Sequence, residues 1–279
     1  MKLAAHTLVK NEGRFVWYSV MSVAPFVDKV YLWDTGSTDS TTAILKELKS
    51  ALGDKMDLRF LNEVDIYAFS KVRQKMLDET REDWFIMLDA DEIWWDSSIK
   101  RVVSFIKKNG GNYESIVVPT INLVGDMYHY QEEKAGLYRL AGRLGHYNIR
   151  AINRGIPGLK SEKPHGTWGW TDGDKKMIQD RNQDKIKYLN APYLHATYLR
   201  RSDVGIGDAK VPKRAKKYKY ELGVKFPYDY YYPEVFFRPK PDCVKNVWEP
   251  INRNYYLKAL MQTPLKKIKR RLIPGKIGY

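Results

Sequence analysis

Short apolar runs and helical apolar spacings alternate along the first part of the chain. The apolar runs predict strands at Leu3–Val9, Val30–Asp34, Leu58–Asn62 and Trp84–Leu88. Apolar residues at helical spacing predict helices over 14–24, 42–51, 68–78 and 97–108. Strands that alternate with helices in this way indicate an α/β fold, with a mixed, mainly parallel sheet flanked by helices.

The later elements are less regular. A long apolar strand is expected at Ser115–Val124, and Pro119 inside it predicts an edge strand or a bulge, because proline cannot donate to a strand ladder. Two further strands are expected at His146–Asn153 and Tyr193–Leu199. The stretch 155–182 is rich in Gly, Lys, Asp and Trp and is interpreted as long loops, which are often functional in compact domains.

Length and cysteine content narrow the class of protein. A chain of 279 residues can bury one sizeable core and carry a small appendage. The single cysteine, Cys243, excludes an internal disulfide and fits a reducing compartment. The first residues lack the apolar segment of a secretory signal, and no stretch approaches the roughly 18 apolar residues of a spanning helix. A cytoplasmic protein is therefore expected.

The net charge of +15 reflects 48 Lys and Arg against 33 Asp and Glu. Such an excess favours anionic partners, which include phosphate-bearing ligands, anionic lipid and nucleic acid. A solvated surface with surplus lysine accounts for part of the same excess. The charge alone therefore does not identify a partner.

Two acids directly follow the strand predicted at 84–88. Asp89 and Asp91 are expected at its carboxyl end, where open α/β sheets bind their ligands. Two carboxylates there form a hard-oxygen site suited to Mg²⁺ or Mn²⁺, with positions left for water and phosphate. An acidic surface turn is the alternative interpretation of the same residues.

A second acid ends the strand predicted at 30–34. Gly36 permits a tight turn after Asp34, and Ser37, Thr38 or Asp39 can cap the helix that follows. A carboxylate beside a helix N-terminus can accept hydrogen bonds from a base or a ribose. A capped strand-to-helix connection without a ligand is the equal alternative.

Four motifs follow one another in a fixed order. They are Val9-Lys10-Asn11-Glu12-Gly13, Asp34-Thr35-Gly36-Ser37-Thr38-Asp39, Phe69-Ser70-Lys71-Val72-Arg73 and Leu88-Asp89-Ala90-Asp91-Glu92. With them the chain resembles the nucleotide-sugar-dependent glycosyltransferases of family 2, which have the Rossmann-like GT-A fold. It is most similar to the branch with K-N-E, D-T-G-S-T-D and L-D-A-D-E motifs, which includes lipopolysaccharide-core glucosyltransferase-like enzymes.

The resemblance is strong over residues 1 to about 95, weaker to about 220, and absent beyond. It implies a GT-A catalytic domain over 1–200, with a nucleotide-sugar half at 1–95 and an acceptor half at 96–200. Residues 201–279 then form a basic and aromatic C-terminal extension.

The resemblance also implies residues that bind the donor. In the family, the loop after the first strand holds the base and ribose. The residues at that place are Val9, Lys10, Asn11 and Glu12. Asp34 matches the acid that contacts the nucleoside, and Thr35 stands where many relatives have a second acid, so uridine and guanosine both stay open.

The implied metal residues come from two parts of the chain. Asp91 is expected to bind Mn²⁺ or Mg²⁺ directly and so to be part of the catalytic machinery. Asp89 is expected to reach the ribose, or the metal through water, and Glu92 to orient Asp91. His195 matches a late histidine that completes the metal site in several GT-A enzymes, and a histidine bonded within the sheet is the alternative.

Three arginines and one acid complete the implied site. Arg73 is expected to pair with the diphosphate or to hold the metal-binding acids, and Arg200 and Arg201 to contact phosphate. Inverting transfer needs a base that takes the acceptor's proton. Relatives often carry His-Glu where this chain has His165 and Gly166, and Asp172 is the candidate base that remains.

Apolar and basic residues alternate at near-helical spacing over 264–274. Such a segment can lie on an anionic membrane surface, which would place the protein at the inner face of a membrane. A solvated tail is the alternative, and nucleic acid is not the expected partner.

These features together predict a metal-dependent glycosyltransferase. It would move a sugar from a UDP- or GDP-linked donor to a hydroxyl of a glycan, a lipid-linked glycan or a protein, with inversion. A nucleotidyltransferase is a second reading, but residues 9–13 do not form its Gly-rich, lysine-containing phosphate loop. A non-catalytic polyanion-binding protein on the same fold is a third.

Overall fold

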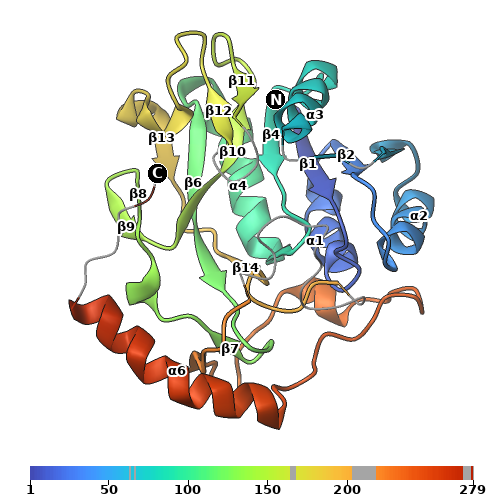
Figure 1. Ribbon diagram of the computed structural model, residues 1–279. Coiled ribbons are helices and arrows are strands. Elements are labelled where there is room, and N and C mark those ends of the chain that lie inside the picture. The colour runs from blue at the N-terminus through green and yellow to red at the C-terminus, as the bar shows by residue number, and fades with distance from the viewer. Residues whose placement is uncertain (63, 66, 164–167, 203–217, 273–277, 279) are drawn as a thin grey trace.

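The computed structural model describes residues 1–62, 64–65, 67–163, 168–202, 218–272 and 278. In these residues a nine-stranded sheet has the order β3-β2-β1-β4-β10-β6-β14-β5, with β13 also paired to β6 (Figure 1). Strands β1 to β4 are parallel, and β10 runs antiparallel between β4 and β6. The sheet is therefore mixed and mainly parallel, which confirms the predicted fold class.

The main sheet is built from short strands. They are β1 (Leu3–Val9), β2 (Lys29–Asp34), β3 (Met56–Phe60), β4 (Trp84–Met87), β5 (Glu92–Trp94), β6 (Ser115–Asn122), β10 (Tyr147–Asn153), β13 (Ile186–Tyr188) and β14 (Tyr193–His195). Three pairs lie outside it: β7 (His129–Tyr130) with β15 (Val224–Lys225), β8 (Tyr138–Leu140) with β9 (Arg143–Gly145), and β11 (Lys160–Glu162) with β12 (Gly169–Thr171).

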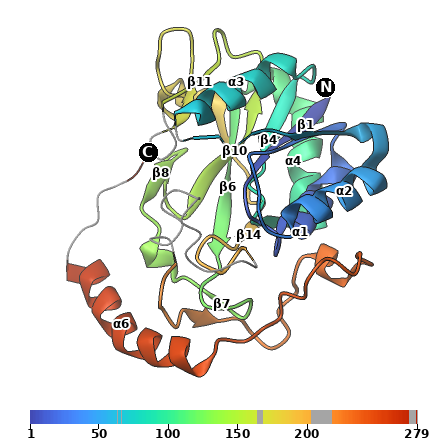
Figure 2. The ribbon, with the colours of Figure 1, turned by 45° about the vertical axis from the view of Figure 1, so that its right-hand side comes forward.

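Helices cover both faces of the sheet (Figures 1 and 2). Their bounds are α1 (Val16–Val23), α2 (Thr41–Leu52), α3 (Ala68–Glu79), α4 (Asp96–Asn109) and α6 (Arg253–Leu272). One hydrophobic cluster joins α1, α2 and α4 to one face of the sheet, and a second joins α3 and the β11–β12 hairpin to the other. In α4, the buried residues Ile99, Val102, Val103 and Ile106 follow the helical spacing seen in the sequence.

Most predicted elements are confirmed within a few residues. The third strand begins two residues earlier than predicted, and the strand expected at Tyr193–Leu199 is confirmed only as the three residues of β14. The stretch 155–182 is not only loop, because β11 and β12 pair within it. Short strands such as these are set by their tertiary partners and leave little period in the sequence.

Pro119 was predicted to mark an edge strand or a bulge; the edge strand is wrong, and the β6–β10 pairing shifts register between Ile149 and Ala151. Strand β6 is interior and pairs with β10 along one side, where Pro119 stands opposite Tyr147. On its other side, β13 pairs with residues 115–117 and β14 with residues 120–122. Pro119 falls between these two partners, so the missing N–H group interrupts neither ladder.

The C-terminal residues from 218 on pack against the rest of the chain. Phe226, Val235, Phe236, Val244 and Val247 belong to the same hydrophobic cluster as α1 and α4. Strand β15 adds a pairing to β7. The extension thus shares the main core, and the boundary near residue 200 stays a prediction. No helix among the described residues is both long and apolar enough to cross a bilayer.

Candidate functional site

The acidic motif lies at the carboxyl edge of the sheet, between β4 and β5. The Ser19 hydroxyl donates to the Asp89 carbonyl at 2.9 Å, and the Ala196 amide donates to the Asp91 carbonyl at 2.8 Å. These bonds fix the turn to α1 and to the end of β14. Asp91 and Glu92 are buried, whereas the Asp89 side chain is 41% exposed, so Asp89 faces solvent at the edge of the cluster.

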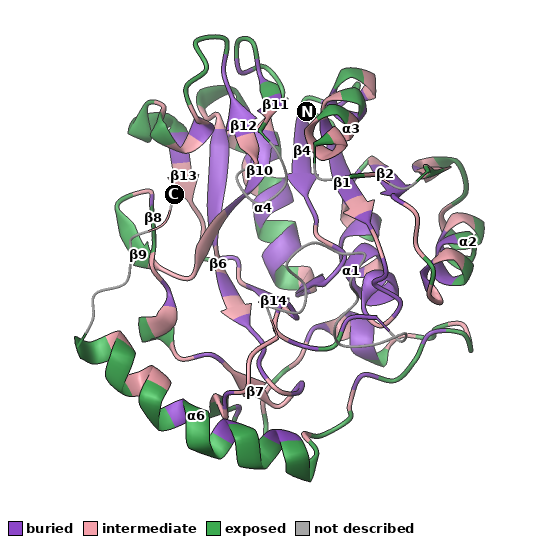
Figure 3. Ribbon diagram, viewed as in Figure 1, coloured by how far each residue is buried: buried purple, intermediate pink, exposed green. Residues whose placement is uncertain are grey.

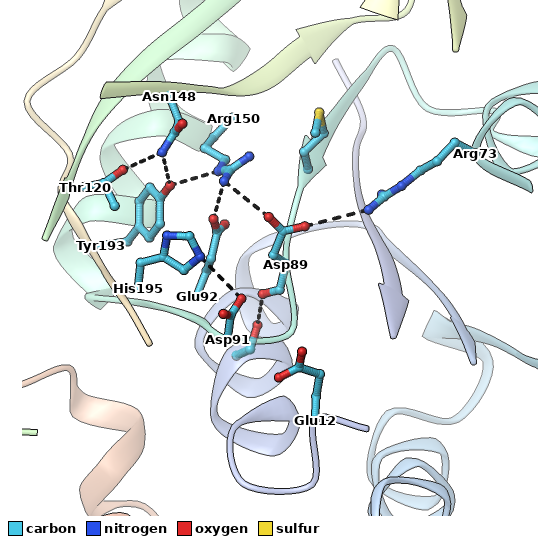
Figure 4. A network of polar contacts seen from close by, with 12 residues as sticks. Glu12, Arg73, Asp89, Asp91, Glu92, Thr120, Asn148, Arg150, Tyr193 and His195 are labelled. Carbon is cyan, nitrogen blue, oxygen red and sulfur yellow. Dashed lines mark hydrogen bonds and ion pairs between the residues drawn. The ribbon is translucent and has the colours of Figure 1, made fainter. Parts of the chain in front are cut away.

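Arg150 on β10 joins the acids of this turn (Figure 4). Its guanidinium contacts the carboxylate of Glu92 and lies 3.4 Å from Asp89 Oδ2, and its Nε donates to the Tyr193 hydroxyl at 2.9 Å. Burial raises the pKa of Asp89, but the charges of Arg150 and Arg73 outweigh it and bring that pKa below its ordinary value. Asp89 is therefore ionised at neutral pH.

Arg201 and His195 contact the second acid of the motif. Arg201 Nη1 lies 2.7 Å from Asp91 Oδ2 and 3.2 Å from Glu12 Oε1, which ties the acidic turn to the loop after β1. His195 Nε2 lies 3.5 Å from Asp91 Oδ1 on the other side of the same carboxylate. Each Asp91 oxygen thus has its own neighbour.

The arrangement of donor atoms fits a divalent cation. Asp89, Glu92 and His195 each offer one ligand atom, and these atoms lie within 4.8 Å of one another. Two ligands at right angles around Mg²⁺ or Mn²⁺ lie roughly 3 Å apart, close to the separation of His195 Nε2 from Asp91 Oδ1. Among the described residues, Glu92 Oε2 is buried and accepts no hydrogen bond. The residues present therefore suit the hard cation expected from the sequence.

The loops after β1 and β2 are bonded to each other beside this cluster. Asn11 has a left-handed φ of 53°. Its side-chain oxygen accepts from the backbone amide of Thr38 at 2.7 Å, and its backbone amide donates to Ser37 Oγ at 2.9 Å. The Asp34 carboxylate is buried and accepts from the Ser37 amide and hydroxyl. Burial raises the pKa of Asp34, and the bonds from Ser37 oppose that shift. The structure shows Asp34 closing this turn, and its nucleoside role stays a prediction.

The other residues predicted to bind the nucleotide-sugar donor differ in how far they are buried. Val9 is buried, and its carbonyl accepts from the Thr35 amide at 2.9 Å. Arg73 is buried with Nη2 at 3.7 Å from Asp89 Oδ1, and burial lowers its pKa to about 10. Lys10 is half-buried, and Arg200 is exposed, with its Nε donating to the Ser202 carbonyl at 3.1 Å. The contact with Asp89 places Arg73 against the acidic turn.

Asp172 pairs with residues outside the acidic turn, and its role as the base stays a prediction. It follows β12, forms an ion pair with Arg181, and accepts backbone bonds from Asp174 and Lys176. Burial raises its pKa, but these bonds outweigh it and the pKa is lowered. Arg181 also holds Glu114, the residue before β6 at the opposite end of the sheet. His165 lies outside the described residues.

Arg150 is a functional candidate that sequence reasoning did not select. Arg150 lies between Ile149 and Ala151 in the middle of β10, and an arginine is almost never fully buried unless it is paired. Arg201 was expected, with Arg200, to contact phosphate, and its contacts with Asp91 and Glu12 were not foreseen. The signal for Arg150 was present in the sequence, whereas nothing local separates Arg201 from Arg200.

A pocket of about 430 Å³ lies next to the cluster, at the ends of β6 and β10. Thr120, His146 and Tyr147 line it from the sheet, and Phe226 and Tyr230 from the extension. Asn148 donates to the Thr120 hydroxyl at 2.8 Å and to the Tyr193 hydroxyl at 2.9 Å, which connects the pocket to Arg150 (Figure 4). The pocket offers both aromatic faces and polar groups.

Comparison with known proteins identifies a family that this chain matches. The model described as "Glycosyl transferase family 2" matches residues 7–162, more than half of the chain. The matched span includes the loops after β1 and β2, Arg73, the acidic turn and Arg150. No curated protein gives a significant match.

Solved structures give distant matches. S. aureus TarS 1–349 is 15% identical with a TM-score of 0.45, over 78% of this chain and 68% of that one. The longer S. aureus TarS structure is 16% identical with a TM-score of 0.46, and the chain spans 41% of its length. Glucosyl-3-phosphoglycerate synthase from Mycobacterium tuberculosis, solved with Mn²⁺, UDP and glucosyl-3-phosphoglycerate, is 16% identical with a TM-score of 0.44, over 70% of this chain and 72% of that one. The branch predicted from the sequence is not resolved by these matches. The family match decides the assignment: this chain belongs to glycosyl transferase family 2 and is a glycosyltransferase.

Proposed function

We propose that the protein transfers a sugar from a UDP- or GDP-linked donor to a hydroxyl, with Mn²⁺ or Mg²⁺ at the acidic turn. The convergence of Asp89, Glu92 and His195 at the carboxyl edge of the sheet, with Asp91 beside His195, carries this proposal. The cation would neutralise the leaving diphosphate as the sugar–oxygen bond breaks. Release of nucleoside diphosphate from a donor in the presence of Mn²⁺ tests it. Family membership favours this reaction over nucleotidyl transfer.

The surrounding cations have separate roles in this proposal. Arg201 and Arg150 hold Asp91 and Glu92 in place from outside the metal position, since each is bonded to its acid at close range. Arg73 contacts the donor diphosphate. Among the described residues, its Nε and Nη1 atoms are buried without hydrogen-bond partners, and unpaired buried donors of this kind favour an anion.

The nucleoside would lie over the paired loops after β1 and β2. We expect Asp34→Ala to weaken binding of the free nucleoside diphosphate five- to a hundredfold, because losing a bond to a buried polar partner costs roughly 1–3 kcal/mol. Isothermal titration calorimetry with UDP and GDP measures the affinity, and Asp34→Asn serves if the alanine variant is unstable.

Ser37→Ala is the matched control for this substitution. It removes the hydroxyl that donates to Asp34 but leaves the carboxylate. If Asp34 only closes the turn, both variants will lower the melting temperature alike and both will bind nucleotide with wild-type affinity. That result would leave Asp34 with a structural role only.

The acceptor would enter the pocket beside the cluster. Tyr147 and Phe226 offer faces on which a sugar ring can pack, and Thr120 offers a hydroxyl at the same wall. His146 Nε2 contacts the Glu132 carbonyl at 3.1 Å, and Nδ1 contacts the Asn122 amide at 3.0 Å, so the ring is fixed in orientation. The acceptor itself is a glycan, a lipid-linked glycan or a protein, and no catalytic base is assigned.

A further inference from the structure

Helix α6 turns its polar face inward and its apolar face outward. The buried residues Tyr255, Ala259 and Thr263 recur every four positions on the inner face. There the Tyr255 hydroxyl donates to the Lys219 carbonyl at 2.6 Å, and Thr263 Oγ1 accepts from the Leu222 amide at 3.0 Å. Polar contacts with the chain around residue 220 therefore attach this helix to the protein.

Ion pairs strengthen the same attachment near the end of the helix. Arg270 Nη1 lies 2.6 Å from Glu221 Oε1 and 3.0 Å from Glu132 Oε1, and Lys266 donates to the Tyr220 carbonyl at 2.7 Å. Because these contacts are specific and partly buried, they fix the rotation of the helix about its axis. The opposite face is consequently held toward solvent.

That outer face is an apolar stripe. Its members are Leu257, Leu260, Met261, Leu265, Ile268 and Leu272, all of them exposed. Met261 and Leu265 are each 68% exposed, and the outer turns of α6 are coloured as exposed along its length in Figure 3. A helix on a globular protein normally buries such a stripe, so this one has no partner within the described chain.

Basic residues flank the stripe on both sides. At 100° per residue, Lys258 and Lys269 fall on one flank and Lys267 on the other, while Arg271 falls within the stripe, between Leu257 and Leu260. The helix contains no acidic residue. An apolar stripe between rows of cations matches a membrane surface, where acyl chains receive the stripe and anionic headgroups receive the cations.

We infer that α6 docks the protein on an anionic membrane surface, with the axis of the helix in the plane of the interface. A second copy of the chain fits the same face less well, since pairing two stripes would bring their flanking lysines together. Nucleic acid would leave the apolar residues without a partner. The inference uses the surface of α6 alone and does not depend on the proposed donor or metal.

Sedimentation with vesicles tests this inference. The full chain should sediment with vesicles that contain phosphatidylglycerol, much less with pure phosphatidylcholine, and less again in high salt, since exposed charges are screened within a Debye length. Met261→Ser/Leu265→Ser/Ile268→Ser should lose most of the binding because it removes the apolar stripe. Lys258→Gln/Lys267→Gln/Lys269→Gln should weaken binding by roughly fivefold for each charge removed.

A matched control variant tests whether vesicle binding depends on α6 or on the net positive charge of the whole protein. Lys46→Gln/Lys107→Gln/Lys108→Gln removes the same charge from exposed residues of α2 and α4, and it should bind vesicles like the wild type. Thermal melts should show all variants folded, because every substituted side chain lies outside the core. Equal vesicle binding by the wild type and the Ser variant, or none by either, would overturn the inference. So would a wild-type oligomer that the Ser variant converts to monomer in light scattering.

Discussion

Asp91→Asn should lower the rate of donor turnover by roughly a thousandfold while the protein stays folded. The substitution nearly preserves shape and can keep a bond to Arg201, but it removes the charge that would hold the cation. Metal stabilisation of a leaving diphosphate is worth several kcal/mol, and each 1.36 kcal/mol corresponds to a tenfold change in rate. Release of UDP or GDP from the sugar nucleotide, followed at saturating Mn²⁺, measures the effect.

Two further variants, one in the same turn and one at a distant control position, are compared with Asp91→Asn. Asp89→Asn should also reduce turnover at least tenfold, because Asp89 is the ionised, solvent-facing acid of the same turn. Asp184→Asn changes an exposed acid in the turn before β13, at the opposite end of the sheet, and should leave turnover unchanged. Wild-type turnover in the Asp91 variant would contradict the assignment of the acidic turn as the metal position.

Arg150→Met should destabilise the fold by about 3–5 kcal/mol. The side chain of Arg150 is buried against Glu92, which is itself buried, so its removal leaves a carboxylate without its counter-charge. The Tyr193 hydroxyl loses a donor at the same time. Urea unfolding in the presence of EDTA measures the change without a contribution from bound metal.

A double-mutant cycle shows whether the pairing with Glu92 causes this loss. Arg150→Met/Glu92→Gln removes both charges and should recover most of the stability lost in the single variant. Arg101→Met changes an exposed arginine of α4 that donates only to the Asn190 carbonyl in the described structure, and it should stay within about 0.5 kcal/mol of wild type. An Arg150 variant as stable as the Arg101 variant would show that the buried pair does not hold the turn.

The sequence predicted the parts of the site that depend on local pattern. Apolar strands that end in Asp34 and Asp89 place both acids at one edge, because parallel strands share that edge. Helix α4 was predictable for a similar reason, since its buried positions repeat at helical spacing. These elements needed no knowledge of distant partners.

The remaining parts depend on contacts between residues far apart in the chain. Arg150 meets Glu92 only because β10 inserts antiparallel beside β4. Pro119 is tolerated in an interior strand only because β13 and β14 divide one side of β6 between them. The ion pair of Asp172 with Arg181, which also holds Glu114, likewise depends on tertiary contacts, and the role of Asp172 as the base stays a prediction.

The C-terminal helix has one feature that the sequence indicated and one that only the tertiary contacts determine. Its apolar and basic residues recur at near-helical spacing over 264–274, and the structure forms α6 as far as Leu272; residues 273–277 lie outside the described residues. The sequence gives no sign that the apolar stripe faces outward. That orientation follows from Tyr255, Thr263 and Arg270, whose partners lie in the segment around Glu221.

The central claim is metal-dependent use of a nucleotide sugar, and one screen tests it most directly. The purified full chain is incubated with a panel of UDP- and GDP-sugars, with Mn²⁺ or with EDTA, and the released nucleoside diphosphate is quantified. We expect one donor, or a small group sharing one base, to be hydrolysed with Mn²⁺ at a rate that EDTA abolishes and added Mn²⁺ restores. Full hydrolysis in EDTA, or equal hydrolysis by wild type and Asp91→Asn, would contradict the account.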